Sequence, residues 1–174
     1  MKEYITKFLP FEEVVTKKLD DTHVEISGYG NVYQALDLTG DVVEKNAFAN
    51  SLVDHKSRGT MPDMLFEHDK RKICGKWLEV KEDSYGLFLR GVVNNTGAYK
   101  NVVSNIKKGG LTGLSIGFII TNAVRRNNVR YIVQGRLEEV SLVGTPANPF
   151  ARFFPTTETI NHEHNLNIRY TNLR

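Results

Sequence analysis

The stretch from Gly113 to Val124 constrains the fold most strongly, because it places one small hydroxyl residue in a long apolar run. Ser115 stands between Gly113 and Gly117, and glycine permits sharp bends and the close approach of another chain. A serine buried in such a run needs a hydrogen-bond partner or a chemical role. Ser115 is therefore packing filler, the nucleophile of a lipase-type elbow, or the nucleophile of another kind of hydrolase.

The residues after Ser115 argue against the lipase-type elbow. The spacing Gly-x-Ser-x-Gly matches the elbow of α/β-hydrolases, which requires a strand, a tight turn and then a helix. Here Phe118-Ile119-Ile120-Thr121 follows, and β-branched and aromatic residues favour a strand. We therefore expect Ser115 to lie on a strand, with its two glycines leaving room for a substrate chain.

Alternation of apolar and polar residues predicts a fold made mainly of strands. The predicted strands are 23–27, 63–68, 72–81, 86–93, 113–124, 129–133 and 137–143. Helices are predicted near 46–56 and from an N-cap at Thr96 to about Lys108. The pattern predicts a β-rich α+β fold with a mostly antiparallel sheet, not an alternating βαβ fold.

Size and charge set the broad class of protein. The 174 residues suffice for one domain with its own core, and 40% hydrophobic with 25% charged residues is ordinary for a globular protein. Residues 1–151 are the predicted packed domain, and 152–174 a polar C-terminal tail. The net charge of +3 comes from scattered Lys and Arg, which argues against nucleic acid as the main ligand.

Cysteine usage and hydropathy indicate the compartment. Cys74 is the only cysteine, so no intrachain disulfide forms, and its neighbours Ile73 and Trp77 favour a core position over a catalytic thiol. No apolar segment near Met1 resembles a leader, and no run reaches the length of a membrane span. We expect a cytosolic protein without a membrane partner.

A serine nucleophile needs a base that takes its proton and an acid that orients this base. Among the five histidines, His68 ends an apolar strand, where a side chain can be held firmly. A capping or half-buried histidine at a strand end is the alternative interpretation.

A pair of carboxylates opens the apolar strand 137–143. Period-two geometry puts Leu137, Glu139 and Ser141 on one face and Glu138 on the other, so only one of the two glutamates faces a given partner. A solvated glutamate at a strand edge is the alternative interpretation.

Several segments in a fixed order extend this pattern over about Val24 to Ala151. They are Gly28-Tyr29-Gly30, Asp37–Val43 with Ala47-Phe48, Met64–Asp69, Gly75-Lys76-Trp77 with Glu82–Leu87, Gly113–Phe118, and Leu137–Val143 with Pro146-Ala147-Asn148. Together they resemble the prohead (capsid maturation) serine proteases of tailed phages, which are related in fold to herpesvirus assemblin. One departure is Lys45-Asn46, where the family commonly has Pro-Gly, although Asn46 can still cap a helix.

The resemblance implies a role for three residues. The family's base carries over to His68, its nucleophile to Ser115 and its acid to Glu139. Glu138 is the alternative acid, because an error of one residue changes the face of the strand. The implied fold is a closed or nearly closed antiparallel β-barrel flanked by a few helices, like that of the herpesvirus proteases.

The resemblance also implies a function and a place of action. This function is a serine endopeptidase that cleaves capsid-assembly proteins during prohead maturation, namely the scaffold or the delta domain of the major capsid protein, and the protease itself. The implied location is the immature procapsid in the host cytoplasm. No metal or cofactor is expected, and a homodimer follows only by analogy with the assemblins.

Two readings from other classes compete with the protease. The first is a non-catalytic capsid- or scaffold-binding assembly module of the same fold, in which His68 and Ser115 need not converge. The second is a metal-binding domain that uses Asp63, His68 and Asp69, or the pair His162 and His164 in the tail. None of these residues has the tight spacing of a zinc site.

Overall fold

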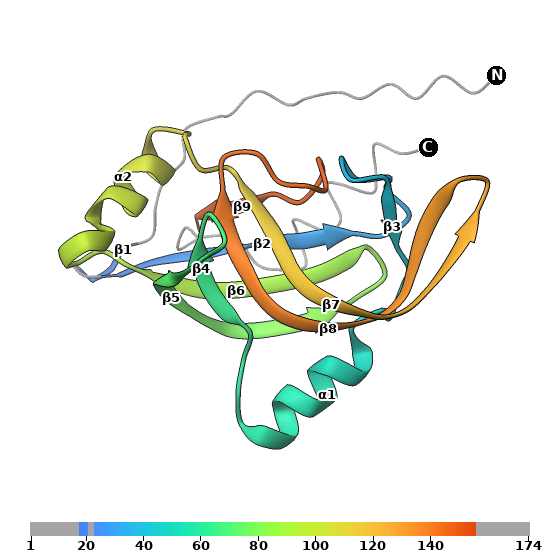
Figure 1. Ribbon diagram of the computed structural model, residues 1–174. Helices are drawn as coiled ribbons and strands as arrows, with labels where there is room; N and C mark the ends of the chain where they lie inside the picture. The colour runs from blue at the N-terminus through green and yellow to red at the C-terminus, as the bar shows by residue number, and fades with distance from the viewer. Residues whose placement is uncertain (1–17, 21–22, 156–174) are drawn as a thin grey trace.

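The computed structural model describes residues 18–20 and 23–155 (Figure 1). The elements in chain order are β1 (Lys18–Asp20), β2 (His23–Val32), β3 (Asp41–Val43), α1 (Ala49–Arg58), β4 (Asp63–Phe66), β5 (Asp69–Glu82), β6 (Gly86–Asn94), the 3₁₀ turn η1 (Gly97–Tyr99), α2 (Lys100–Lys107), β7 (Gly113–Arg126), β8 (Val129–Val143) and β9 (Phe153–Pro155). The predicted β-rich α+β class is confirmed.

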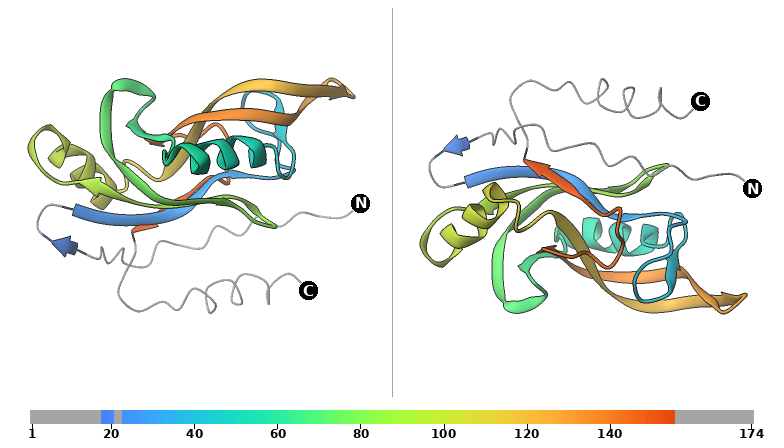
Figure 2. Two further views of the ribbon diagram at one scale, coloured as in Figure 1. Left: turned by 90° about the horizontal axis from the view of Figure 1, so that it is seen from below. Right: turned by 90° about the horizontal axis from the view of Figure 1, so that it is seen from above.

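The described strands form one strongly curled sheet. Its order is β1-β2-β6-β5-β4-β8-β3, with β7 on β8 and β9 on β2. Figure 2 shows that the curl brings the β2-β6-β5 part over the β7-β8 part, as in half of a barrel. Helix α1 covers the opening between these two parts on one side.

The pairing is mostly antiparallel, as predicted, but the sheet curls into half of a barrel instead of the expected closed or nearly closed antiparallel barrel. Its pairing also departs from antiparallel at one place that matters for the site. Both β4 and β3 pair with β8 in parallel, so the sheet is mixed. In the β4–β8 ladder, Leu65 lies beside Ser141 and Phe66 beside Leu142. This parallel pairing places the end of β4 alongside the C-terminal end of β8.

Most of the predicted elements are confirmed with shifted ends. The hairpin of β5 and β6 is confirmed, and Asp83 Oδ1 accepts hydrogen bonds from the N–H groups of Tyr85 and Gly86 in its turn. The two strands predicted at 129–133 and 137–143 are one strand, β8. Thr96 precedes the second helical segment without capping it, since its hydroxyl donates to Asn94 Oδ1 at 2.7 Å.

The start of α1 explains the departure at Lys45-Asn46. Asn46 has a φ of 64°, a left-handed conformation that glycine and asparagine adopt most easily. Asparagine can therefore replace the family's glycine here. The helix begins after Phe48, which makes no side-chain capping hydrogen bond, so the predicted cap at Asn46 is wrong.

The core fills the space inside the curled sheet. Its fully buried side chains include Phe48, Met64, Leu89, Leu114 and Leu142. Buried Phe153 of β9 belongs to the same core, so the packed region extends beyond Ala151, the end of the predicted domain. Residues 156–174 of the predicted tail lie outside the described part of the chain. Among the described helices, none is long and apolar enough to cross a membrane.

Candidate active site

The antiparallel pair of β7 and β8 gathers the candidate residues on one face. Ser115 lies directly opposite Ser141, and Gly117 directly opposite Glu139. A Cβ on Gly117 would collide with the carboxylate of Glu139, so this carboxylate lies over the Gly117 side of β7. Alternation along β7 places Ser115 on the same face.

A β-bulge in β8 separates the two neighbouring glutamates. Gly117 pairs with Glu139 but the next residue, Phe118, pairs with Leu137, so Glu138 is the extra residue. Glu138 is exposed and its Oε1 accepts from Arg136 Nε at 2.6 Å, whereas Glu139 is only 7% exposed. The bulge also breaks the predicted alternation, because Leu137 is buried in the core instead of sharing the face of Glu139.

Helix α1 holds the backbone beside this bulge. The N–H of Leu137 donates to Ser51 Oγ at 2.9 Å, and its carbonyl oxygen lies 3.0 Å from His55 Nε2. Side chains of α1 thus satisfy backbone groups next to the disrupted ladder. His55 therefore has a structural role and is not part of the candidate site.

His68 projects from a tight turn between β4 and β5. Phe66 pairs with Asp69, so Glu67 and His68 form a two-residue hairpin turn, with φ values of 51° and 58°. His68 is therefore a turn residue, not the last residue of a strand as predicted. Positive φ is uncommon for residues other than glycine and is tolerated where surrounding contacts fix the backbone.

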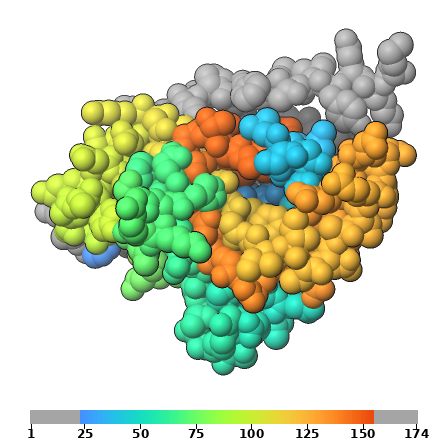
Figure 3. Space-filling model, in the orientation of Figure 1, coloured from blue at the N-terminus to red at the C-terminus, as the bar shows by residue number. Residues whose placement is uncertain are grey.

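Contacts with β8 and the segment after it fix this turn. The N–H of Glu67 donates to the carbonyl of Leu142 at 3.1 Å, and the N–H of Gly144 donates to Glu67 Oε1 at 3.0 Å. The N–H of His68 donates to Ser141 Oγ at 3.0 Å. Figure 3 shows the green segment that contains this turn against the orange segment of β8.

The imidazole of His68 is oriented by Glu139. Nδ1 of His68 lies 2.5 Å from Glu139 Oε1, and the other carboxylate oxygen, Oε2, accepts from Ser141 Oγ at 2.7 Å. A neutral histidine that donates from Nδ1 carries its lone pair on Nε2. No hydrogen bond to Nε2 is formed within the part of the chain that the structure describes. The hydrogen bond that His68 donates to the Glu139 carboxylate raises the pKa of His68, and burial opposes this shift more weakly.

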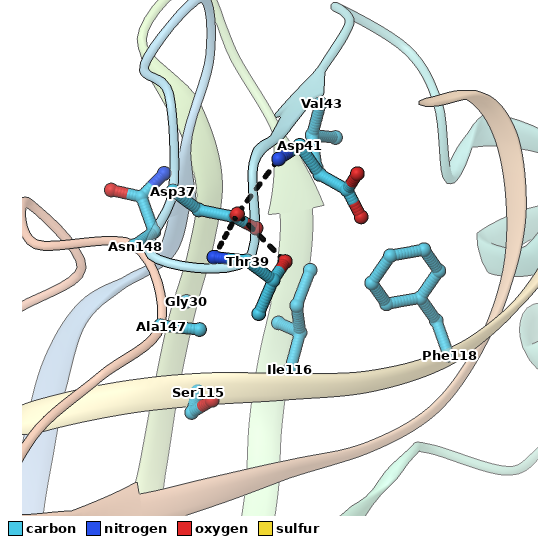
Figure 4. A pocket seen from close by; sticks show the side chains of 10 residues that line it. All are labelled: Gly30, Asp37, Thr39, Asp41, Val43, Ser115, Ile116, Phe118, Ala147 and Asn148. Carbon is cyan, nitrogen blue, oxygen red and sulfur yellow. Dashed lines mark hydrogen bonds between the residues drawn. The ribbon is translucent and has the colours of Figure 1, made fainter. Parts of the chain in front are cut away.

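Ser115 is buried, with 6% of its surface exposed, and borders a pocket of about 140 Å³. The pocket is lined by Gly30, Asp37, Thr39, Asp41, Val43, Ser115, Ile116, Phe118, Ala147 and Asn148. Figure 4 shows Ile116 and Phe118 pointing from β7 toward the loop of Asp37, while the Ser115 side chain lies across the strand from that loop. The pocket is the hollow between the light-blue loop and yellow β7 in Figure 3.

Two carboxylates in the pocket wall make different contacts: one forms an ion pair and the other accepts hydrogen bonds within its own loop. Asp41 forms a bidentate ion pair with Arg130, in which Nε donates to Oδ1 at 2.8 Å and Nη2 donates to Oδ2 at 2.6 Å. Asp37 Oδ1 accepts from the N–H and hydroxyl of Thr39 and from the N–H of Asp41, which closes the loop. Sequence reasoning did not identify this pocket, because its walls come from segments far apart in the chain.

The structure thus brings the predicted residues to one face but joins only two of them. His68 and Glu139 are hydrogen-bonded, whereas no hydrogen bond connects Ser115 with His68 among the described residues. Ser141 was not predicted as a member of the site. A signal for it existed, since alternation placed its hydroxyl on the face of Glu139 and a buried hydroxyl needs a partner.

Other candidate residues do not form sites in the described part of the chain. Burial raises the pKa of Cys74 to about 12, so its thiol stays protonated and unreactive in the core. No three His, Cys, Asp or Glu side chains there converge as metal ligands, and Asp69 instead pairs with Arg71 and Lys72. His162 and His164 lie outside the described residues.

The two glycines around Ser115 leave room for the protein's own side chains, not for a substrate chain as predicted. A Cβ on Gly113 would come within 2.6 Å of the ring of Pro146, and one on Gly117 would overlap the Glu139 carboxylate. Gly117 is therefore required by the contact between Glu139 and His68.

We expect Gly117→Ala to displace the Glu139 carboxylate and to lower the pKa of His68 toward that of an ordinary histidine. The measurement is an NMR titration of the His68 ring. Gly110→Ala is the matched control, because its Cβ would meet no atom closer than 3.6 Å. An unchanged His68 pKa in Gly117→Ala would show that the carboxylate is not held as described.

Comparisons with known proteins identify relatives in sequence. The chain is 30% identical over 155 residues to the prohead protease of Enterobacteria phage HK97, covering 83% of this chain and 65% of that protein. It is 31% identical over 134 residues to the prohead protease of Escherichia phage T5, covering 75% of this chain and 61% of that protein. The chain therefore spans somewhat less than two thirds of the length of these relatives.

A solved structure and a family match complete the comparison. The fold is similar to that of KSHV protease in complex with a hexapeptide phosphonate inhibitor, with a TM-score of 0.50 at 13% identity over 85% of this chain and 75% of that one. This likeness supports the herpesvirus-protease-like fold. Residues 12–165 match the family described as caudovirus prohead serine protease. The chain belongs to the caudovirus prohead serine protease family.

Proposed function

We propose that this chain is a serine endopeptidase in which Ser115 is the nucleophile, His68 the general base and Glu139 the acid that orients the base. The observation that carries the proposal is the 2.5 Å contact between His68 Nδ1 and Glu139 Oε1 on the face that holds Ser115. It fixes the tautomer whose free Nε2 can accept a proton. Catalytic hydrogen bonds often shorten only when substrate is bound, so the missing contact with Ser115 is compatible with this role.

The proposed reaction proceeds in two halves. Ser115 Oγ attacks the peptide carbonyl carbon while His68 Nε2 takes its proton, and Glu139 stabilises the resulting imidazolium. Collapse of the tetrahedral intermediate breaks the C–N bond, and His68 gives its proton to the leaving amine. Water, activated by His68, then releases the acyl group from Ser115.

We propose capsid-assembly proteins as the substrates, cleaved inside the immature procapsid. Family membership and the names of the relatives support this class of substrate. The scaffold, the delta domain of the major capsid protein and the protease itself are the proposed targets. A homodimer is proposed by analogy alone.

The test is co-expression of the chain with the major capsid protein and scaffold of the same phage. We expect shortened forms of one or both substrates, visible by mass spectrometry, and uncut substrates with Ser115→Ala. Co-purification of uncut substrates with the wild-type chain would instead support the alternative, a non-catalytic assembly module.

The rate of cleavage is expected to rise with pH. A general base works in its neutral form. The hydrogen bond that His68 donates to Glu139 raises the pKa of His68, so protonated His68 persists to higher pH than an ordinary histidine. The lower inflection of kcat against pH should therefore lie above the ordinary histidine pKa. Removing the carboxylate charge with Glu139→Gln should move the inflection to lower pH, and an inflection that does not move would contradict the assignment.

A further inference from the structure

The hydroxyl of Ser141 connects the two oriented members of the proposed site. It donates to Glu139 Oε2 at 2.7 Å and accepts the backbone N–H of His68 at 3.0 Å. Its residue is completely buried in the structure, with 0% of its surface exposed. One hydroxyl therefore contacts both the carboxylate that orients the base and the turn that carries it.

We propose that Ser141 is a positioning residue that holds His68 and Glu139 in the relative orientation that proton transfer requires. The inference rests on the proposed function of Ser115, His68 and Glu139. In this role Ser141 does not contact the substrate. Its two observed hydrogen bonds are with Glu139 and His68, the residues that it positions.

The same contacts argue against Ser141 as the nucleophile. A serine hydroxyl has one proton to donate, and that of Ser141 goes to Glu139, which cannot act as its base while it is bound to His68. Its oxygen is also inaccessible. Ser115, directly opposite on β7, makes no side-chain hydrogen bond among the described residues, so its proton is not committed to another group.

The turn of His68 makes this support necessary. Glu67 and His68 both adopt positive φ, which side chains other than glycine rarely adopt, so external contacts must hold them. Ser141 supplies the contact to His68 itself, whereas Leu142 and Gly144 contact only Glu67. Loss of the hydroxyl would free the His68 backbone and leave Oε2 of a buried carboxylate without its donor.

Threonine and valine form a matched pair at this position. They have nearly the same shape, but only threonine keeps a hydroxyl. Any effect of the added volume on strand β8 is therefore common to Ser141→Thr and Ser141→Val. Ser141→Ala provides a third variant that removes the hydroxyl without adding volume.

The probe is a simple fluorophosphonate, whose reaction needs no knowledge of the cleavage site. Ser115 Oγ attacks phosphorus, its proton passes to His68, and the P–F bond breaks to release fluoride. The limiting rate of labelling and the half-saturating concentration are measured separately, at a temperature below the unfolding transition of every variant.

We expect Ser141→Val and Ser141→Ala to lower the limiting rate about 10–100-fold, the range found when partners that orient metal-binding histidines are lost. The half-saturating concentration should stay within about twofold, since Ser141 contacts no ligand. Ser141→Thr should label at least about fivefold faster than Ser141→Val.

Two results would overturn the inference in different ways. Equal limiting rates for the threonine and valine variants, with the wild-type chain labelled on Ser115, would remove the role of Ser141 but leave the proposed function standing. Absence of labelling at Ser115 in the wild-type chain would overturn the proposed function and this inference with it.

Discussion

Ser115→Ala is expected to abolish peptide-bond cleavage while the protein stays folded. Without Oγ no acyl-enzyme forms, and loss of a serine nucleophile lowers kcat by at least about 10⁴-fold. The fold should tolerate the change, because the Ser115 side chain makes no hydrogen bond within the described residues and alanine is slightly smaller. The measurements are cleavage of the capsid substrate and the midpoint of thermal unfolding.

The control for this variant is Ser84→Ala, in the exposed turn between β5 and β6. It should cleave at the wild-type rate. Wild-type cleavage by purified Ser115→Ala would exclude Ser115 as the nucleophile, whatever the behaviour of the control.

The second large loss of kcat is expected on substitution of Glu139 and not on substitution of its neighbour Glu138. Glu139→Gln keeps the size of the side chain but removes the charge that stabilises the His68 imidazolium, and should lower kcat about 10²–10⁴-fold. Glu138→Gln is the matched control, because Glu138 is exposed on the bulge and forms an ion pair with Arg136. Exposed ion pairs contribute about 0–1 kcal/mol to the free energy of unfolding, so this control should retain its stability and its activity.

The pair of variants decides which glutamate works with His68. We expect kcat to separate them by at least about 10²-fold with similar unfolding midpoints. Equal losses in both, or a loss only in Glu138→Gln, would contradict the contact between Glu139 and His68 as the working arrangement.

Local patterns predicted the strands and one face of the site well. The β-branched residues after Ser115 identified β7 as a strand, and turn residues located the hairpin of β5 and β6. Alternation within β8 allowed only one of Glu138 and Glu139 to face a given partner. These features depend on neighbours in the sequence, which a single chain displays directly.

Other features arise from contacts between distant segments and could not be predicted from the pattern. The parallel pairing of β4 with β8 brings the turn of His68 beside Ser141, about seventy residues further along the chain. The bulge at Glu138 depends on how β7 and β8 align, and it moved Leu137 from the predicted face into the core. The hydrogen bonds of Ser141 with His68 and Glu139 depend on both the parallel pairing and the bulge.

The glycines around Ser115 show how a motif can be noticed for the wrong reason. The sequence predicts that Gly113 and Gly117 leave room for a substrate chain, but in the structure they accommodate Pro146 and Glu139. Both of those residues follow in sequence by more than twenty positions. The requirement for glycine therefore became explicable only with the packing of β7 against β8 and the segment after it.

Mapping the fluorophosphonate adduct by peptide mass spectrometry tests the central claim most directly, because it asks which serine is activated. We predict one adduct in the wild-type chain, on Ser115, and labelling slowed by at least about 10²-fold in His68→Ala. An adduct on Ser141, or labelling of Ser115 at the same rate without His68, would contradict the account.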